Sequence, residues 1–211
     1  MEYLPGVGIS EYEEEKMLEA LERAKECDII VLALGEEPMM SGESNSRMDI
    51  CLPGRQEDYA KRLFALGKPV VVVLYSGRPL AVPEIAGKAN ALLEAWMPGT
   101  EGNRAVRDIL TGHRSPSGRL TMSFPYSTGQ CPVYYNRYST GRPAKDPYHS
   151  DRFTSRYIDG PGVPFYPFGH GLTYTEFEYG SVELSSGMVR RREKIYARCT
   201  VRNTGERESY I

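Results

Sequence analysis

A charged loop holds the side chains of this sequence that are best suited to acid–base chemistry. Residues 35–49 read GEEPMMSGESNSRMD, with three glutamates, one aspartate and one arginine. A strand and a helix are usually joined by about two to six residues, so a loop of this length favours a functional role. Its carboxylates can deliver a proton to a neighbouring site or accept one. The alternative is an ordinary polar surface loop, in which Arg47 pairs with Asp49 or Glu43.

The segments around this loop predict the elements that must position it. Asp28–Leu34 and Val70–Tyr75 are continuous apolar runs, which are typical of strands buried on both faces in a parallel sheet, and Ala89–Trp96 predicts a third strand. Helices are predicted in the remaining segments, at residues 10–26, 53–67, 83–87 and 100–111. The first is expected to begin with a capping box of Ser10 and Glu13.

This order of elements predicts an α/β fold, a mostly parallel sheet with helices on both faces. In such sheets ligands bind beyond the carboxyl ends of the strands, which is where the charged loop begins. Residues 120–124 are a possible edge strand. Trp96, the single tryptophan, ends a predicted strand and is more simply a core residue than part of a binding site.

The character of the chain changes after about residue 130. Residues 131–178 are rich in Tyr, Pro and Gly and predict an irregular connector, whereas residues 179–211 predict the first strands of a β-domain. A β-sandwich needs about 100 residues, so we expect this last domain to be truncated. Its open strand edges would need partners. We therefore expect the tail to lie against the α/β domain or to join the sheet of a neighbouring chain, making a homo-oligomer possible.

Composition excludes several classes of protein. The 211 residues carry 26 Lys and Arg against 28 Asp and Glu, a balance that argues against nucleic-acid binding. The longest apolar runs are far shorter than the roughly 20 residues that span a bilayer, so we expect no membrane partner. Cysteines and histidines lack metal-ligand spacing, so no metal site is expected. Residues 1–5 do not resemble a signal peptide, and the compartment of a longer parent stays open.

Several motifs occur in an order that is known from one family. They are CDIIVLALGE (27–36), SGESNSRMDICLPGRQ (41–56), GKPVVVVLYSGRPL (67–80), ALLEAWMPGTEGNRAVRDILTG (91–112), SPSGRLTMSFPYSTGQCPVYYN (115–136), TGRP (140–143), FTSRYID (153–159), FYPFGHGLTYTEFEY (165–179) and VRNTGERE (201–208). The chain resembles the C-terminal part of glycoside hydrolase family 3 enzymes of the β-glucosidase type. The resemblance covers nearly the whole chain.

This resemblance implies a parent enzyme with three parts: a (β/α)₈ barrel, an α/β sandwich and a fibronectin-III-like domain. Residues 1–130 would be the sandwich, 131–178 the connector and 179–211 the start of the third domain, without the barrel. In the family the barrel supplies an Asp nucleophile and most sugar contacts, and the sandwich supplies the general acid/base. The implied reaction is retaining hydrolysis of terminal β-glucosides or oligosaccharides without a cofactor, with β-xylosides as the nearest alternative.

The resemblance places the acid/base role on Glu43. Its neighbours Ser41, Gly42 and Ser44 are small and would let the loop approach a sugar. Glu36 is the alternative.

Other residues of the loop have supporting roles in this interpretation. Glu36 and Glu37 directly follow the strand and are expected to support the loop. Arg47 and Asp49 are expected to hold it by a charge-assisted hydrogen bond, or to be a plain surface pair.

Two methionines of the loop have two possible roles. Met39 and Met40 would line an aglycone site or pack beneath the loop. Without the barrel, we expect residues 36–49 to be weakly packed.

Two further functions stay open, and both would make the chain something other than part of a hydrolase. One is a non-catalytic carbohydrate-binding or scaffold domain. The other is a doubly wound nucleotide-binding domain, which needs a phosphate-binding loop after the first strand. Residues 35–37, Gly-Glu-Glu, have the wrong charge for phosphate. In the leading interpretation the isolated chain is inactive, because it lacks the nucleophile of the barrel.

Overall fold

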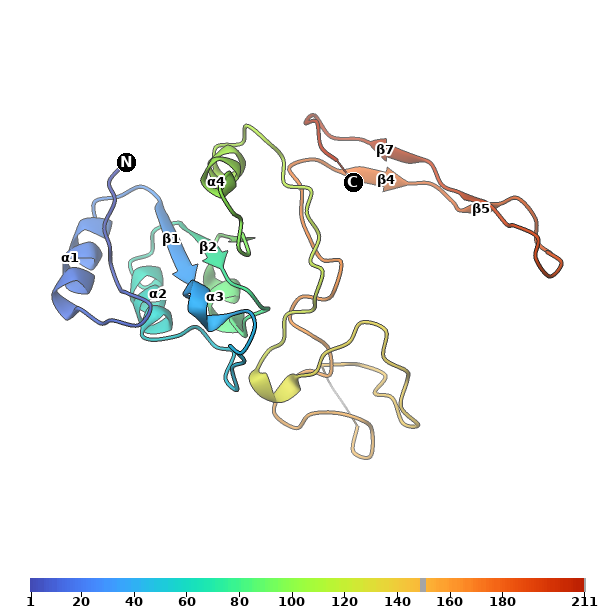
Figure 1. Cartoon of the computed structure of the whole chain (residues 1–211), viewed down its shortest axis with the longest axis horizontal. Coiled ribbons are helices and arrows are strands. Elements are labelled where there is room, and N and C mark those ends of the chain that lie inside the picture. Colours follow the sequence, from blue (N-terminus) through green and yellow to red (C-terminus); the bar gives the residue numbers. More distant parts are fainter. Residues whose placement is uncertain (149–150, 211) are drawn as a thin grey trace. The chain divides into compact units, whose positions relative to one another are not determined.

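The computed structural model describes residues 1–148 and 151–210 of the chain (Figure 1). Backbone contacts divide the chain into two units. Unit 1 contains Met1–Asn103 and Leu120–His170, and unit 2 contains Arg104–Arg119 and the chain from Gly171 onward. Residues 149, 150 and 211, which belong to the predicted connector and the predicted truncated domain, lie outside the described residues.

Unit 1 is built on three parallel strands that lie in the order β1-β2-β3. These strands are β1 (Ile30–Gly35), β2 (Val70–Tyr75) and β3 (Ala91–Glu94). In the register, Ile30 lies opposite Val70 and Gly35 opposite Tyr75. The parallel sheet predicted from the apolar runs is therefore confirmed, with a third strand that is shorter than expected.

All four predicted helices are present. They are α1 (Glu14–Ala24), α2 (Gln56–Phe64), α3 (Pro83–Lys88) and α4 (Gly102–Leu110), and two short 3₁₀ turns are η1 (Pro38–Met40) and η2 (Thr128–Gln130). The predicted capping box is wrong: Glu13 is the N-cap of α1, and the Ser10 hydroxyl donates instead to the Glu37 carboxylate at 2.6 Å. Within the described part of the chain, no helix combines the length and apolarity that crossing a bilayer requires.

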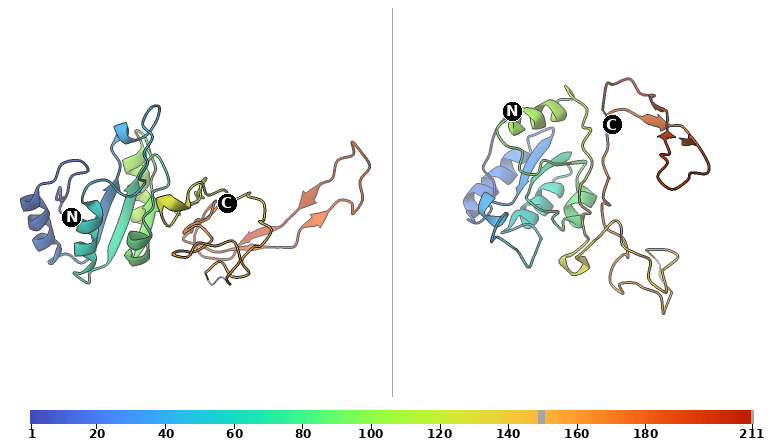
Figure 2. Two further views of the ribbon diagram at one scale, coloured as in Figure 1. Left: turned by 90° about the horizontal axis from the view of Figure 1, so that it is seen from below. Right: turned by 45° about the vertical axis from the view of Figure 1, so that its right-hand side comes forward.

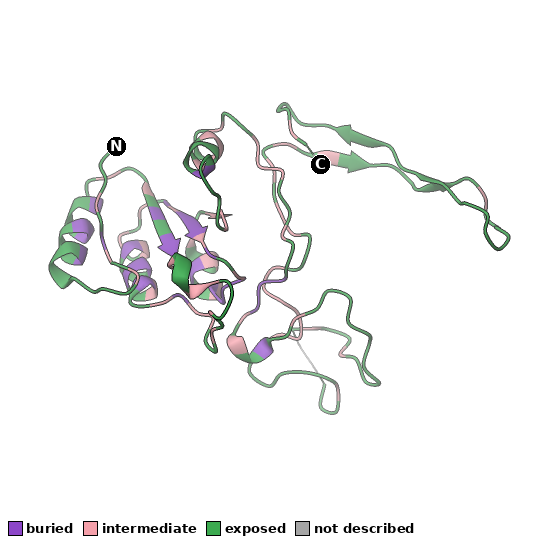
Figure 3. Ribbon diagram, in the orientation of Figure 1, coloured by how far each residue is buried: buried purple, intermediate pink, exposed green. Residues whose placement is uncertain are grey.

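The core of unit 1 lies on one face of the sheet. Leu32, Leu34, Val72 and Leu74 point to this face and are buried. The apolar sides of α1 and α2 pack against them, through Met17, Ala20, Leu21, Ala24, Tyr59, Ala60 and Leu63. Figure 2 shows these two helices on one side of the strands, and Figure 3 shows the buried residues gathered there. Burying one large aliphatic side chain contributes about 1.5–3 kcal/mol. On the opposite face of β1, Val31 is exposed, so the prediction that this strand is buried on both faces is wrong; on the same face of β2, Val73 is buried.

Phe124 and, from the connector, Tyr166 complete this core. Phe124 is buried, and its ring centroid lies 5.8 Å from that of Trp96, which packs against the core as predicted. The backbone of Phe124 pairs with Tyr166 in a single bridge, so the predicted edge strand at 120–124 is reduced to isolated pairing. Most of the described connector beyond these residues is irregular and exposed.

Unit 2 contains most of α4 and four short strands. They are β4 (Phe177–Tyr179), β5 (Glu183–Leu184), β6 (Ala197–Arg198) and β7 (Val201–Asn203). β4 pairs with β7 and β5 with β6, both antiparallel. The predicted tail strands therefore exist, and they pair with each other, whereas we expected the tail to lie against the α/β domain or to join the sheet of a neighbouring chain. The Tyr174 hydroxyl donates to the Ile109 carbonyl at 3.0 Å, which joins the tail to α4.

Candidate active-site loop

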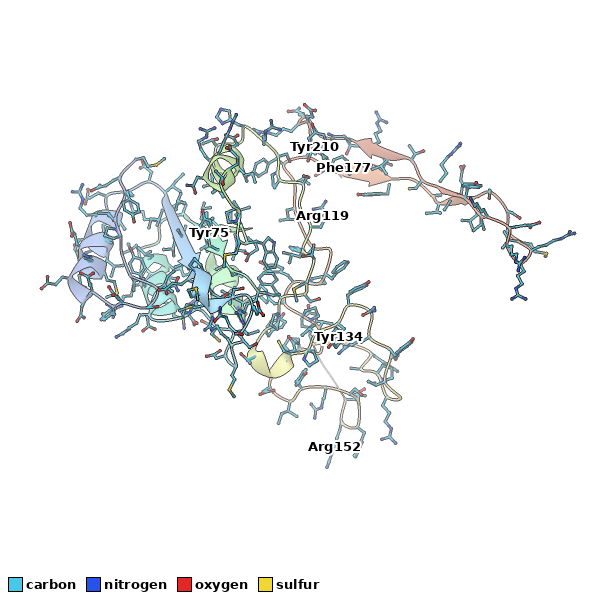
Figure 4. All side chains as sticks on the ribbon, in the orientation of Figure 1. Tyr75, Arg119, Tyr134, Arg152, Phe177 and Tyr210 are labelled. Carbon is cyan, nitrogen blue, oxygen red and sulfur yellow. The ribbon has the colours of Figure 1, made fainter. Side chains whose placement is uncertain are left out.

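The charged loop begins where β1 leaves the sheet, beside the end of β2 (Tyr75 is labelled in Figure 4). Gly35 has φ 154°, and a Cβ on it would lie 1.9 Å from the carbonyl oxygen of Tyr75, so this position needs glycine. The buried Gln56 side chain donates to the Gly35 carbonyl and accepts from the Gly35 N–H, both at 2.8 Å. The starting point of the loop is thus fixed by strand pairing and by α2.

Glu36 is a buried carboxylate between two guanidinium groups. Its side chain has no accessible surface. Arg47 Nη1 lies 2.6 Å from Glu36 Oε1, and Arg78 Nε lies 3.1 Å from the same oxygen. The N–H of Gly77 points to Oε2 at 3.4 Å. Burying a charge is costly unless it is paired and hydrogen-bonded, and both conditions are met here.

The same two arginines also hold the backbone of the loop. Arg47 Nη2 donates to the Cys51 carbonyl at 3.1 Å. Arg78 Nη2 donates to the Asn45 carbonyl at 3.0 Å and also to the Met40 carbonyl. The base of the loop is therefore anchored, although we expected weak packing throughout. Sequence reasoning missed Arg78, whose only signal is a charge placed three residues after the end of a strand.

Arg47 was predicted to pair with Asp49 or Glu43, but in the structure it pairs with Glu36. Asp49 accepts hydrogen bonds from the Cys51 N–H at 3.0 Å and the Thr128 hydroxyl at 3.3 Å. The bond from Cys51 is the main reason why the pKa of Asp49 lies below its ordinary value. Asp49 thus ties the far end of the loop to the segment that contains η2.

Glu43 lies at the exposed tip of the loop. The tip is a turn in which the Asn45 N–H donates to the Gly42 carbonyl at 3.2 Å, and the Asn45 side chain donates to the Ser41 carbonyl at 3.3 Å. Ser44 has a positive φ of 63°, as such turns often require. The structure therefore separates Glu36 from Glu43: one carboxylate is buried and paired at the base, and the other is exposed at the tip.

The remaining predicted residues lie near the start of the loop. Met39 is 76% exposed and Met40 is half-buried, and both belong to η1. Glu37 is half-buried and accepts the hydrogen bond from Ser10.

A second carboxyl, on the half-buried Glu94, lies at the same edge of the sheet, and sequence reasoning did not find it. Glu94 ends β3, and its Oε1 accepts a hydrogen bond from the Trp96 N–H at 2.8 Å and lies 3.2 Å from the Ser76 hydroxyl oxygen. Its Oε2 is buried and has no hydrogen-bond partner among the described residues. Burial raises the pKa of Glu94 to about 8, and the negative charge of Glu36 adds to this effect. Burial thus favours the protonated form of Glu94.

The connector offers aromatic surface away from this loop. A hollow of about 400 Å³ is lined in part by Tyr134, Tyr135 and Phe168. The rings of Tyr135 and Phe168 stack with their centroids 4.2 Å apart, while Tyr134, labelled in Figure 4, is 63% exposed. These aromatic residues of the connector are thus packed in part and exposed in part.

Comparison with known proteins identifies the family. The family described as glycosyl hydrolase family 3 C-terminal domain matches residues 4–174. This chain belongs to glycoside hydrolase family 3. Among the family 3 relatives, a periplasmic β-glucosidase of Salmonella typhimurium is 47% identical over 190 residues, which are 90% of this chain and 25% of the relative. A β-xylosidase of Formosa agariphila is 36% identical over 204 residues, 97% of this chain and 27% of the relative.

Solved structures of the family agree with the fold. The crystal structure of a β-glucosidase from Listeria innocua in complex with isofagomine matches with a TM-score of 0.86 and 44% identity, over 93% of this chain and 27% of that one. The α/β fold and the family predicted from the motifs are therefore confirmed. This chain spans about a quarter of the length of these family 3 relatives.

Proposed function

We propose that this chain supplies the general acid/base of a retaining family 3 β-glucosidase, and that Glu43 is that residue. The observation that carries the proposal is the geometry of the loop, which presents an exposed carboxylate at its tip and is anchored at its base by buried ion pairs. In this proposal the substrate is bound by the barrel, so the general acid must extend beyond its own domain to reach it. An exposed carboxylate at the tip of a loop can do so.

The proposed chemistry needs a second carboxylate from the barrel of the parent enzyme. In retaining hydrolysis the two carboxyl groups lie about 5–5.5 Å apart. The barrel Asp attacks the anomeric carbon while Glu43 gives its proton to the departing glycosidic oxygen. Glu43 then takes a proton from water, which attacks the glycosyl-enzyme and releases the sugar. Without the barrel the chain has no nucleophile in this scheme, so the isolated chain is inactive.

The contacts of Glu36 and Glu37 support the choice of Glu43. Glu36 has no accessible side-chain surface, and both its oxygens are engaged by cationic or N–H donors. Protonating it would leave Arg47 and Arg78 without their counter-charge. Glu37 already accepts a hydrogen bond from Ser10. These two residues are better suited to supporting the loop, as is Asp49. The exposure of Met39 in η1 supports a contact with an aglycone.

The proposal is tested in the full-length parent enzyme with Glu43→Ala and Glu43→Gln. Hydrolysis of an aryl β-glucoside whose leaving group needs protonation should fall about 10²–10⁴-fold, the usual contribution of general acid/base catalysis. A dinitrophenyl glucoside should still form the glycosyl-enzyme, because its leaving group needs little help. Azide needs no general base, so it should rescue Glu43→Ala and release β-glucosyl azide.

Glu37→Gln is the matched control and should retain nearly normal rates. Near-normal hydrolysis by Glu43→Ala would contradict the proposal. Azide rescue of Glu36→Gln in place of Glu43→Ala would move the acid/base role to Glu36.

A second substrate class is favoured by one observation. The relative from Formosa agariphila, which is 36% identical over 97% of this chain, is a β-xylosidase. The ratio of kcat/KM for an aryl β-glucoside to that for an aryl β-xyloside, measured on the parent enzyme, distinguishes the two substrates. A ratio well above one supports the glucoside assignment, and a ratio well below one replaces it with the xyloside.

A further inference from the structure

Arg78 connects two segments that are far apart in the sequence. It lies in the connection between β2 and α3, and its guanidinium reaches the loop that follows β1. It donates to Glu36 at the base of the loop and to the carbonyls of Met40 and Asn45. These two carbonyls stand three residues before Glu43 and two residues after it. The Arg78 side chain is therefore hydrogen-bonded to the backbone on both sides of the turn that carries Glu43.

The backbone below this turn is shaped to let the loop come close. A Cβ on Gly77 would lie 1.8 Å from the Ser41 hydroxyl oxygen and 2.5 Å from Ser41 Cβ, so the loop rests directly on Gly77. The fully buried Ser76 donates its hydroxyl to the Arg78 carbonyl at 2.8 Å. Ser76 therefore holds the backbone from which the guanidinium extends.

The chemistry of this contact is specific to arginine. A guanidinium is planar, always charged, and presents its donors in a rigid fork, whereas a lysine ammonium is a single point charge on a flexible stem. A lysine at position 78 could neutralise Glu36 and still fail to hold the Met40 and Asn45 carbonyls together. The charge and the geometry of the contact can therefore be separated by substitution.

We infer that Arg78 is a positioning residue for Glu43. It touches no reacting atom and acts by fixing the backbone on both sides of the turn. Proton transfer requires a heavy-atom distance of about 2.6–3.2 Å, and a displacement of about 1 Å can cost about 10²-fold in rate. The inference rests on the proposed function of Glu43, because a positioning role is meaningful only if Glu43 transfers the proton.

The test uses Arg78→Met and Arg78→Lys in the full-length parent, with Arg55→Met as the control. Arg55 lies at the surface, where it pairs with Asp58 at 3.2 Å and its guanidinium lies 4.6 Å from the centroid of the Tyr12 ring. For an aryl β-glucoside with a poor leaving group, both Arg78 variants should lower kcat/KM about 10–100-fold. For a dinitrophenyl glucoside, formation of the glycosyl-enzyme should change less than about threefold, because that step needs little protonation. Arg55→Met should leave both rates unchanged.

A double-mutant cycle distinguishes failure of the inference from failure of the proposed function. In a Glu43→Gln background, Arg78→Met should cause no further loss on the poor leaving group, since residues that act as a unit are non-additive. Equal losses on both substrates, or additive losses in the cycle, would overturn the inference and leave Glu43 in place. Normal activity of Glu43→Gln by itself would instead overturn the proposed function.

Folding of each variant is checked by thermal unfolding. If Arg78→Met does not fold, Arg78→Lys retains the counter-charge of Glu36 and carries the test by itself. Loss of the fold in both variants would overturn the inference, because Arg78 would then serve the stability of the sheet edge.

Discussion

At the scale of the residue, the pair of carboxylates Glu36 and Glu43 shows how burial assigns different tasks to one side-chain type. Glu36 is buried between Arg47 and Arg78, whereas Glu43 is exposed. We predict that Glu36→Gln lowers the free energy of unfolding of the purified chain by about 3 kcal/mol, because removing one partner of a buried ion pair leaves the other charges uncompensated. Urea unfolding followed by circular dichroism measures this loss. Glu43→Gln is the control and should change stability by less than about 0.5 kcal/mol; equal stability of the two variants would contradict the prediction.

At the scale of the element, two glycines of unit 1 should respond to alanine in opposite directions. A Cβ on Gly35 would lie 1.9 Å from the Tyr75 carbonyl oxygen, and φ at Gly35 is 154°. Gly35→Ala should therefore force β1 and β2 apart and destabilise the chain by more than about 3 kcal/mol, as strained backbone and lost strand pairing combine. Gly87 lies in α3 with nothing within 4 Å of its virtual Cβ, so Gly87→Ala should stabilise the chain by about 0.4–1 kcal/mol. Thermal unfolding of both variants measures the difference, and a stable Gly35→Ala would show that the strand end tolerates a side chain.

At the scale of the whole molecule, Glu94 makes the stability of the chain depend on pH. The pKa of Glu94 is raised from 4.5 to about 8 in the folded chain, mainly by burial. Between these values the folded state binds a proton that the unfolded state has lost, so the free energy of unfolding falls as pH rises from about 4.5 to 8. We expect a fall of several kcal/mol, because a change of one unit in a pKa corresponds to roughly 1.4 kcal/mol of stability. Urea unfolding at several pH values should show it.

Glu94→Gln tests the origin of this pH dependence. Glutamine cannot ionise, so the slope between about pH 4.5 and 8 should flatten. Asp49, with its lowered pKa, acts in the opposite direction and only at acidic pH, so it does not disturb this window. An unchanged slope in Glu94→Gln would assign the dependence to another group.

Much of the fold of unit 1 could be predicted from local pattern. Two continuous apolar runs and the segment 89–96 indicated three parallel strands, which are present. The central strand β2 is mostly buried, as a continuous apolar run predicts, whereas β1 exposes Val31 on one face. The order of motifs indicated the family, and the small residues around Glu43 indicated an accessible tip. These features are local, so the sequence alone carries them.

The contacts that anchor the loop could not be predicted in this way. Arg47 pairs with Glu36 in preference to Asp49, and Ser10 reaches Glu37 in preference to capping α1. Arg78 is 42 residues from Glu36 in the chain, and Glu94 interacts with Ser76 across 18 residues. Such pairs meet only because the parallel register of β1, β2 and β3 brings the strand ends to one edge.

The sequence by itself thus determined which segments form the sheet, which family the chain belongs to and where a catalytic carboxylate was to be sought. Only the tertiary structure decided which of the carboxylates is buried and which is exposed. The physical reason is that burial and ion pairing depend on groups brought together by folding, whereas strand formation and turn formation depend mainly on neighbours along the chain.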